Sequence, residues 1–313
     1  MTAARSRART GPRDVPVRVA VVGATGFIGG RVCRALLARG DEVVAVSRGG
    51  EAGVPGAVDV RWDPAEGPPP AAVTEGAEAV VNMAGASIGG KRWTAERKRV
   101  IRESRTIPTR LLVDALAADA APRVLVNASA VGYYGPAEGE VDESSPPGSD
   151  FLADTCVAWE REALRAREHG VRVVLLRTGI VLSADGGALP QMALPVKLFA
   201  GGPIGGGRQW IPWIHIDDEV GLVLLALDDP SVAGPLNATA PEPVRQRELV
   251  RAIGGALGRP VILPTPALVL RLAMGEMSTL ALDGQRAVPR AALAAGYSFV
   301  HADVGEAMRD IYA

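Results

Sequence analysis

The stretch VRVAVVGATGFIGGRVCRALLAR, residues 17–39, decides the fold of this chain. Residues 17–22 are a β-branched apolar run of strand length, and from Phe27 apolar residues recur at helical spacing. Three glycines spaced G-x-x-G-x-x-G separate the two patterns: Gly23, Gly26 and Gly29. A strand that turns at glycines into a helix directs backbone N–H groups and the positive end of the helix dipole toward one point, which suits a pyrophosphate. An ordinary β-turn-α connection can carry the same glycines, but a second strand expected at 42–47 completes the unit, and together they predict dinucleotide binding.

Further along the chain, strand and helix patterns alternate, which predicts parallel βαβ units wound right-handed. The expected strands after the first lie at 42–47, 58–64, 79–82, 124–127 and 171–176. The expected helices start at Phe27, span 94–118 with an interruption near Pro108, and span 151–167. The alternation stops after residues 177–179. The fold class is therefore α/β, a Rossmann-type doubly wound parallel sheet with a small C-terminal α/β substrate lobe.

Changes in composition along the chain predict where the domains begin and end. We expect a disordered leader at 1–16, a dinucleotide-binding domain at 17–240 with a substrate-loop insertion at about 183–214, and the C-terminal lobe at 241–313. The leader holds several arginines and no apolar core, so a secretory signal is excluded, although a transit peptide is conceivable. No segment has the roughly 18–20 apolar residues that a membrane span needs.

Charge and cysteine content narrow the function classes. The 313 residues carry a net charge of −1 with both signs interspersed, which argues against nucleic acid or an anionic membrane as the main partner. The two cysteines make no metal-spaced cluster, and a reducing cytoplasm fits best. We expect a small-molecule substrate.

The end of the second expected strand favours one nicotinamide cofactor. Ser47 and Arg48 stand at its tip, where the adenosine ribose lies in this fold, and the nearby acids Asp41 and Glu42 precede the strand. Arginine at this position attracts a 2′-phosphate, so NADP(H) is predicted over NAD(H), unless Arg48 is a solvated loop cation. Asp63 stands at the end of the third expected strand, where it could contact adenine or cap a turn.

Small and hydroxyl-bearing residues follow two central strands. Residues 82–86 (NMAGA) would let the cofactor lie against backbone, and Ser129, Tyr133 and Tyr134 come after the fifth strand, at the expected position of the nicotinamide.

The second half of the chain offers fewer signals. The glycine-rich segment 198–213 lacks a strand-to-helix context and is expected to be a flexible lid or hairpin. Trp210 and Trp213 beside it could floor a substrate pocket or simply pack. His215 precedes a helix with an acid, Asp217 or Asp218, at a plausible cap. Nothing else with metal-ligand spacing accompanies His215, so no metal site is predicted.

A collinear set of motifs now points to a family. The chain resembles the short-chain dehydrogenase/reductase superfamily, and within it an atypical extended subgroup of NAD(P)-dependent epimerase-like proteins with a C-terminal domain of unknown function. The motifs that carry the resemblance include GATGFIGG (23–30), SR (47–48), WDP (62–64), NMAG (82–85), YYG (133–135), RTGIVLSADGGAL (177–189) and GGPIGGGRQWIPWIHIDD (201–218).

The resemblance implies roles for individual residues. It implies that the pyrophosphate is held by Gly23, Thr25, Gly26, Phe27, Ile28 and Gly29. It implies that Ser47 and Arg48 hold the adenosine phosphate, and that the ribose is lined by Met83, Ala84 and Gly85. Arg105 and the region of Val181 would close over the cofactor, and Ser129 matches the catalytic Ser/Thr position. The long helices of the superfamily also imply a possible homodimer.

One departure from the family pattern concerns the chemistry itself. Superfamily enzymes use a Tyr-x-x-x-Lys pair, in which the lysine lowers the pKa of the phenol, and this sequence contains no such pair. Leu152 and Cys156 stand at the two positions. Tyr133 or Tyr134 with Ser129 could substitute, or the tyrosines could be wall residues. Glu160 is interpreted as a solvated helix carboxylate, with an acid–base role as the alternative, and Cys156 as a small buried filler.

Two hypotheses of different classes follow. The first is an NADP(H)-dependent oxidoreductase or epimerase acting on a small carbonyl or hydroxyl substrate. The second is a non-catalytic, NADP(H)-responsive binding or regulatory protein that lacks the Tyr/Lys pair. A nucleotide-sugar epimerase is a weaker variant of the first, because such enzymes use that same pair.

Overall fold

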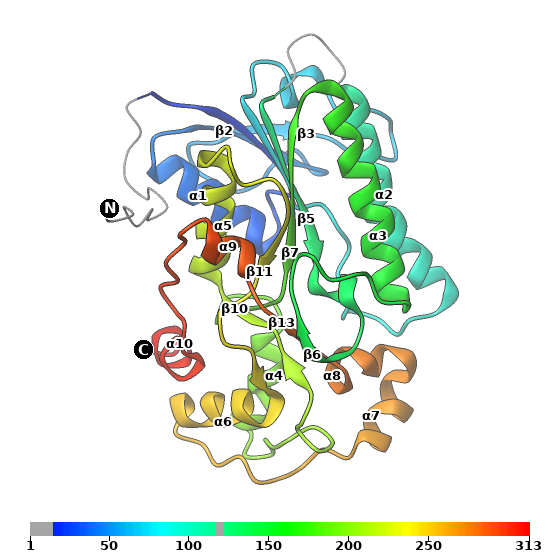
Figure 1. Cartoon of the computed structure of the whole chain (residues 1–313), viewed down its shortest axis with the longest axis vertical. Coiled ribbons are helices and arrows are strands. Elements are labelled where there is room, and N and C mark those ends of the chain that lie inside the picture. Colours follow the sequence, from blue (N-terminus) through cyan, green and yellow to red (C-terminus); the bar gives the residue numbers. More distant parts are fainter. Residues whose placement is uncertain (1–14, 117–121) are drawn as a thin grey trace.

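A seven-stranded parallel sheet forms the centre of the chain (Figure 1). The computed structural model describes residues 15–116 and 122–313, so the predicted disordered leader falls almost entirely outside the described residues. The strands are β1 (Arg18–Val22), β2 (Glu42–Ser47), β3 (Val58–Arg61), β4 (Ala79–Asn82), β5 (Val124–Ala130), β7 (Arg172–Thr178) and β11 (Gly234–Ala238). Their order is β11-β7-β5-β4-β1-β2-β3, and all neighbours are parallel. The Rossmann-type doubly wound sheet is confirmed.

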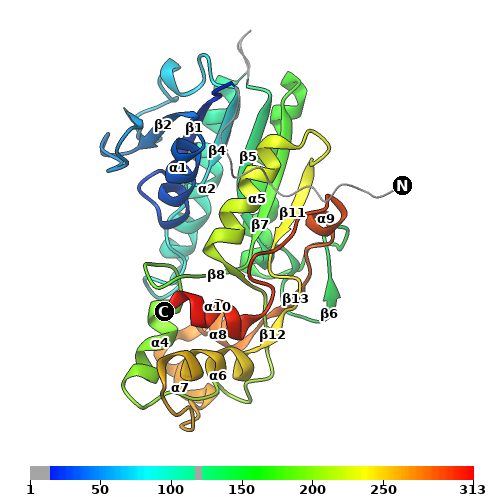
Figure 2. The same ribbon diagram turned by 90° about the vertical axis from the view of Figure 1, so that its left-hand side faces the viewer.

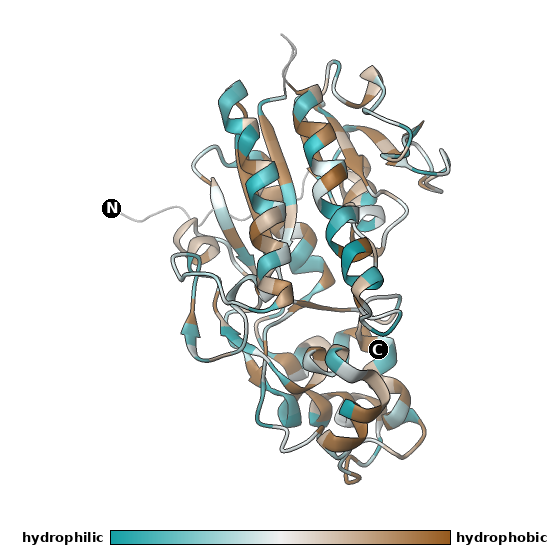
Figure 3. Cartoon of the chain, turned by 90° about the vertical axis from the view of Figure 1, so that its right-hand side faces the viewer, coloured by the Kyte–Doolittle hydropathy of each residue, from teal (hydrophilic) through white to brown (hydrophobic). Residues whose placement is uncertain are grey.

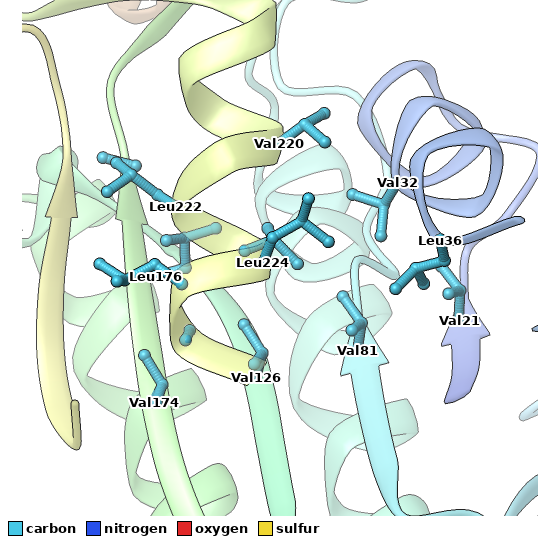
Figure 4. Packing of buried hydrophobic residues seen from close by; sticks show 14 of the residues in the cluster. Val21, Val32, Leu36, Val81, Val126, Val174, Leu176, Val220, Leu222 and Leu224 are labelled. Atoms are coloured by element: carbon cyan, nitrogen blue, oxygen red, sulfur yellow. The ribbon is translucent and has the colours of Figure 1, made fainter. Parts of the chain in front are cut away.

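Helices cover both faces of this sheet. On one face α1 (Phe27–Ala38) and α5 (Ile216–Asp228) pack against alternate strand residues such as Val21, Val81 and Leu176 (Figure 4). On the other face lie α2 (Ala95–Ala115) and α3 (Phe151–Leu164), whose ribbons are coloured as hydrophilic at many residues (Figure 3). The period-two burial of the strands thus supplies two apolar cores, one for each helical layer.

The second helix is continuous, which corrects the expected interruption near Pro108. Proline removes one backbone N–H, a loss that normally kinks a helix. Here the turns on both sides are held by buried contacts: Ile101 and Leu112 are fully buried, and Thr109 is hydrogen-bonded to Asn82 and Trp159. Packing therefore maintains the helix through the proline.

The seventh strand, β11, was not predicted, because the alternation was expected to stop after residue 179. Its sequence is GPLNA, which has a glycine, a proline and an asparagine and little β propensity. It pairs in parallel with β7 at the edge of the sheet, where a proline is tolerated. Strand β7, helix α5 and strand β11 therefore form one more parallel β-α-β unit.

The remaining elements form a lobe below the sheet (Figures 1 and 2). Its helices are α4 (Leu189–Lys197), α6 (Gln246–Leu257), α7 (Ala267–Met274), α8 (Thr279–Leu282) and α10 (Val304–Ile311), and α9 (Arg290–Ala294) packs beside β11. The small strand pairs are β10 (Trp213–His215) with β8 (Ile180–Leu182), β12 (Val244–Arg245) with β9 (Trp210–Ile211), and β13 (Gln285–Ala287) with β6 (Ala137–Val141). Within the described ranges, no helix is both long and apolar enough to cross a bilayer.

The glycine-rich segment 198–213 is not a hairpin, contrary to one expectation. Its strand β9 pairs with β12, which is distant in sequence, and Gly205 N–H donates to the carbonyl of Thr265. A Cβ on Gly202 would lie 2.0 Å from the carbonyl oxygen of Leu263. The glycines here allow the segment to pack closely against the C-terminal lobe.

Candidate functional site

Two adjoining cavities lie at the carboxyl edge of the sheet, with volumes of about 460 and 560 Å³. Both are lined by the glycine turn after β1 and by the residues after β4, including Gly23, Gly26, Met83 and Gly85. The smaller cavity extends toward the end of β2, and the larger one extends toward the ends of β5 and β7 and the C-terminal lobe. Together they form a trough at the place where ligands bind in doubly wound sheets.

The glycine turn requires glycines on steric grounds. Gly23 has φ +83°, and a Cβ there would lie 3.0 Å from the backbone of Met83. A Cβ on Gly29 would lie 2.3 Å from the carbonyl oxygen of Gly23, closer than any carbon can approach. Helix α1 can therefore start against the strand, with its first N–H groups directed at the trough.

The smaller cavity has the residues predicted for the adenosine end. Arg48 is exposed and lines it, together with the buried Ser47, whose hydroxyl accepts a hydrogen bond from the N–H of Gly50 at 3.1 Å. Asp63 also lines this cavity and accepts the N–H of Ala65 at 3.0 Å, so it caps a turn at the cavity wall.

All the residues predicted to bind the cofactor line one or both cavities. These are Gly23, Thr25, Gly26, Phe27, Ile28, Gly29, Ser47, Arg48, Asp63, Met83, Ala84, Gly85, Arg105 and Val181. Their individual contacts to a cofactor stay predictions, but the fold brings them together from six separate segments.

Arg105 lies at the wall of the larger cavity, beside Gly85, which lines both cavities. A Cβ on Gly85 would meet its guanidinium at 3.2 Å, and its Nη1 donates to the carbonyl of Ile101 at 2.9 Å. Burial lowers the pKa of Arg105. Among the described residues no carboxylate oxygen lies within 4.0 Å of it, so this cation can face an anionic ligand group.

The larger cavity ends at a buried ion pair that was not predicted. Ser129 lies within β5, not after it, and donates to Glu160 Oε1 at 2.6 Å. Arg177, at the end of β7, donates to both oxygens of the same carboxylate at 2.9 Å. Ser129, Glu160 and Arg177 are 4, 5 and 2% exposed. The interpretation of Glu160 as a solvated carboxylate is therefore wrong.

Arg177 supplies the positive charge that faces this buried carboxyl group. Although burial opposes the positive charge, the hydrogen bonds and negative charge of Glu160 raise the pKa of Arg177. A bidentate guanidinium–carboxylate pair is the strong geometry for such a contact. Because the Ser129 hydroxyl proton is directed to Glu160, its oxygen presents lone pairs to the cavity.

The structure does not bring Tyr133 and Tyr134 to the cavity wall. The two rings meet edge to face, and Arg177 lies 3.5 Å from the ring centroid of Tyr133. The hydroxyl of Tyr134 donates to Asn237 Oδ1 at 2.7 Å and accepts from Arg177 at 3.0 Å. Burial raises the pKa of Tyr134 to about 12. The hypothesis that these phenols replace the Tyr/Lys pair lacks the geometry it requires, because the short 3₁₀ turn after β5 directs them behind Ser129.

Leu152 and Cys156, by contrast, do line the larger cavity at the positions expected for the Tyr/Lys pair. The thiol of Cys156 donates weakly to the carbonyl of Ala130 at 3.7 Å. Burial, with the negative charge of Glu160, raises the pKa of Cys156 to about 12, so the thiol stays neutral at physiological pH.

A second buried carboxyl approaches the same edge from the opposite layer. Glu219 on α5 is fully buried, and its Oε1 is hydrogen-bonded to the Thr178 hydroxyl at 2.7 Å. Burial raises the pKa of Glu219 from its ordinary value of 4.5 to about 8.

This pKa shift predicts a pH-dependent stability. Between pH 4.5 and 8 the native state keeps a proton that the unfolded state has lost, so the free energy of unfolding falls as pH rises through this window. One unit of pKa corresponds to about 1.4 kcal/mol. The free energy of unfolding of Glu219→Gln, relative to that of the wild type, should therefore rise by about 3 kcal/mol from pH 5 to pH 8. Urea unfolding at the two pH values measures this gain, and an unchanged difference would show that Glu219 is ionised in the native state.

The two tryptophans, Trp210 and Trp213, lie in different places. Trp210 lines the larger cavity, whereas Trp213 is fully buried in the lobe, where its indole N–H donates to the carbonyl of Glu242 at 3.1 Å.

His215 caps the helix itself, in place of the expected acid: its Nδ1 accepts the N–H of Asp217 at 3.2 Å. His301 lies against it, with the ring centroids 3.8 Å apart, and Nε2 of His215 lies 3.5 Å from Asp310 on α10. Both nitrogens of His215 thus face partners within the protein. The absence of a metal stays a prediction.

Comparisons with known proteins place this site in a family. The sequence model described as "NAD dependent epimerase/dehydratase family" matches residues 19–238, and a domain of unknown function (DUF1731) matches residues 265–311. The chain is 42% identical to "Epimerase family protein SDR39U1 homolog, chloroplastic" of Arabidopsis thaliana, over 96% of this chain and 88% of the relative. It is 41% identical to "Epimerase family protein Mb2239" of Mycobacterium bovis, over 93% of this chain and 96% of the relative.

A solved structure shares the whole architecture. The crystal structure of human epimerase family protein SDR39U1 (isoform 2) with NADPH has a TM-score of 0.85 and 38% identity, and the match covers 95% of this chain and 99% of that one. The family model spans well over half of the chain, and these relatives match nearly its full length. The chain therefore belongs to the NAD-dependent epimerase/dehydratase family.

Proposed function

We propose that the chain binds NADP(H) and acts as an oxidoreductase or epimerase on a small carbonyl or hydroxyl substrate. One observation carries this proposal: a continuous trough runs from Arg48, past the glycine turn, to Ser129. NADPH is also the ligand with which the human relative was crystallised.

The residues present fit a dinucleotide. The cradle at Gly23, Gly26 and Gly29 is built from backbone that any Cβ would crowd, and Arg48 stands where a 2′-phosphate needs a cation. Arg105 adds a half-buried positive charge at the wall of the larger cavity. When bound, the nicotinamide supplies or takes up a hydride at the end of the trough that holds Ser129.

The chain's own residues orient the substrate there. With its proton directed to Glu160, Ser129 Oγ accepts a hydrogen bond and fits a substrate hydroxyl. Apolar side chains line the same cavity. They include Ile88, Val131, Leu152, Trp210 and Leu280.

The charges of the larger cavity favour a substrate without phosphate groups. Asp150 and Asp283 line its far wall, and burial together with Asp150 raises the pKa of Asp283. A nucleoside diphosphate sugar would place two negative charges near these carboxylates. A small uncharged carbonyl compound or alcohol fits better, which separates this chain from the sugar epimerases whose family name it shares.

A second candidate function rests on Leu152 and Cys156, which line the cavity where the superfamily has its acid–base pair. Neither side chain can transfer a proton at neutral pH. An NADP(H)-responsive regulator, which binds the cofactor without turnover, would retain the trough and need no proton donor.

The cofactor assignment is tested by titrating the protein with NADPH and NADH and following nicotinamide fluorescence. We expect Arg48→Ala to weaken NADPH binding about ten- to a hundredfold, the loss of a hydrogen-bonded charge pair, and to leave NADH binding unchanged. Arg61→Ala is the matched control, because this exposed arginine on β3 is paired with Glu66 and does not line the cavity. Equal affinity for NADH and NADPH in the wild type would contradict the assignment.

The chemistry is tested by screening small aldehydes, ketones and alcohols for turnover of the bound cofactor. Stereospecific hydride transfer that Ser129→Ala reduces would support the enzyme. Tight NADPH binding with no turnover, joined to cofactor-dependent association with a protein, would support the regulator. A cytoplasmic location and a homodimer stay predictions.

A further inference from the structure

Carbonyl reduction consumes a hydride and a proton, and the groups around Ser129 do not supply the proton. The phenols of Tyr133 and Tyr134 do not line the cavity. Both oxygens of Glu160 accept hydrogen bonds from Arg177, and the neutral thiol of Cys156 keeps its proton. If the proposed function holds, a proton donor must lie elsewhere along the cavity wall.

Glu219 has the environment of a neutral carboxylic acid. Its side chain is completely buried, its Oε2 has no hydrogen-bond partner, and no cationic nitrogen of the described residues lies within 4.0 Å. Its chain neighbours Asp217 and Asp218 are acidic. The phenol of Tyr297 lies close enough for the charge of Glu219 to raise its pKa, and it too is negative when ionised. Burial disfavours an ionised carboxylate here more than the hydrogen bond from the Thr178 hydroxyl stabilises it, so the protonated form is favoured.

Thr178 connects this carboxyl to the cavity. It lies at the end of β7, is half-buried, and lines the larger cavity, while its hydroxyl is 2.7 Å from Glu219. Ser129 pairs with Arg177 and Ala130 with Thr178 across the two strands, so Ser129 and Thr178 belong to opposite faces of the sheet. Ser129 faces α3 and is hydrogen-bonded to Glu160, which is paired with Arg177. Thr178 faces α5 and is hydrogen-bonded to the carboxyl group of Glu219.

When two carboxyl groups of one site have environments this different, one can accept a proton and the other can donate one. We infer that Thr178 donates the proton of the reduction and that Glu219 is the reservoir that replenishes it. A bound reduced nicotinamide would supply the hydride to the carbonyl carbon, and the carbonyl oxygen would take the Thr178 hydroxyl proton. The Thr178 oxygen takes the proton of Glu219, which is left as a carboxylate. Solvent returns the proton through Thr178 once the product has left, and oxidation runs the same path backward.

The test needs neither cofactor nor substrate. The full-length protein is moved from H₂O to D₂O at pH 6, and the carbonyl stretch of protonated carboxyl groups is followed by infrared spectroscopy. We expect Glu219→Gln to remove one protonated-carboxyl band that Asp283→Asn, a carboxyl of the same cavity, leaves in place. That band should exchange within the mixing time in the wild type, at least tenfold more slowly in Thr178→Val, and again rapidly in Thr178→Ser.

Two results would overturn the inference. One is a protonated-carboxyl spectrum that Glu219→Gln leaves unchanged, because Glu219 would then be ionised. The other is exchange in Thr178→Val that is as fast as in the wild type, because the proton would then use another route. Failure of NADPH to bind would contradict the proposed function separately and leave the exchange result standing.

Discussion

Arg177→Met is expected to lower the free energy of unfolding by about 3–5 kcal/mol, because it leaves the Glu160 carboxylate buried without its cation. Methionine keeps much of the side-chain volume, so the loss measures charge and hydrogen bonding more than packing. The expected loss is larger at pH 8 than at pH 5. An unpaired Glu160 takes up a proton more readily in the folded state than in the unfolded state, which relieves the penalty as pH falls. Urea unfolding at both pH values measures the effect.

A matched surface variant and a double variant sharpen this test. Arg165→Met removes a largely exposed partner of Asp114 and Glu162, and should cost less than about 1 kcal/mol. Adding Glu160→Leu to Arg177→Met removes the stranded charge and should restore a large part of the stability. If Arg177→Met alone is as mild as Arg165→Met, the buried pair is not the constraint that its geometry indicates.

This pair also shows what could not be predicted from sequence. Glu160 and Arg177 belong to different elements, and the sequence presents them as a carboxylate on a helix and an arginine after a strand. The parallel register that sets Arg177 beside Ser129, with α3 packed over both, creates the contact. The available signal was Arg177 itself, a charge at the end of a buried apolar strand, which requires a partner. Thr178 and Glu219 were missed for the same reason.

The parts that were predicted correctly depend on local pattern. The glycine turn, the first six strands and the helices α1, α2 and α3 each follow from apolar periodicity within a short window. The seventh strand has no such pattern and exists because β7 offers a partner edge. The two phenols were placed in the site by their distance along the chain from Ser129, and the short turn at 131–134 directs them elsewhere.

The glycine turn supplies the second large effect. Gly29→Ala is expected to weaken NADPH binding at least a hundredfold, equivalent to about 2.7 kcal/mol, in the same fluorescence titration. The new Cβ would lie 2.3 Å from the Gly23 carbonyl oxygen, which belongs to rigid backbone, so the start of α1 must move away from β1. The N–H groups at the start of α1 move with it and no longer converge on the pyrophosphate.

Gly255→Ala is the matched control for this substitution. Gly255 is an exposed residue of α6 with no atom within 4 Å of its added Cβ, so alanine there should stabilise the helix by about 0.5–1 kcal/mol and leave cofactor affinity unchanged. The two variants make the same chemical change, and they differ in whether backbone already occupies the space. If Gly29→Ala binds NADPH as tightly as Gly255→Ala does, close contact between α1 and β1 is not what forms the cofactor site. The trough would then have to hold its ligand mainly through side chains such as Arg48 and Arg105.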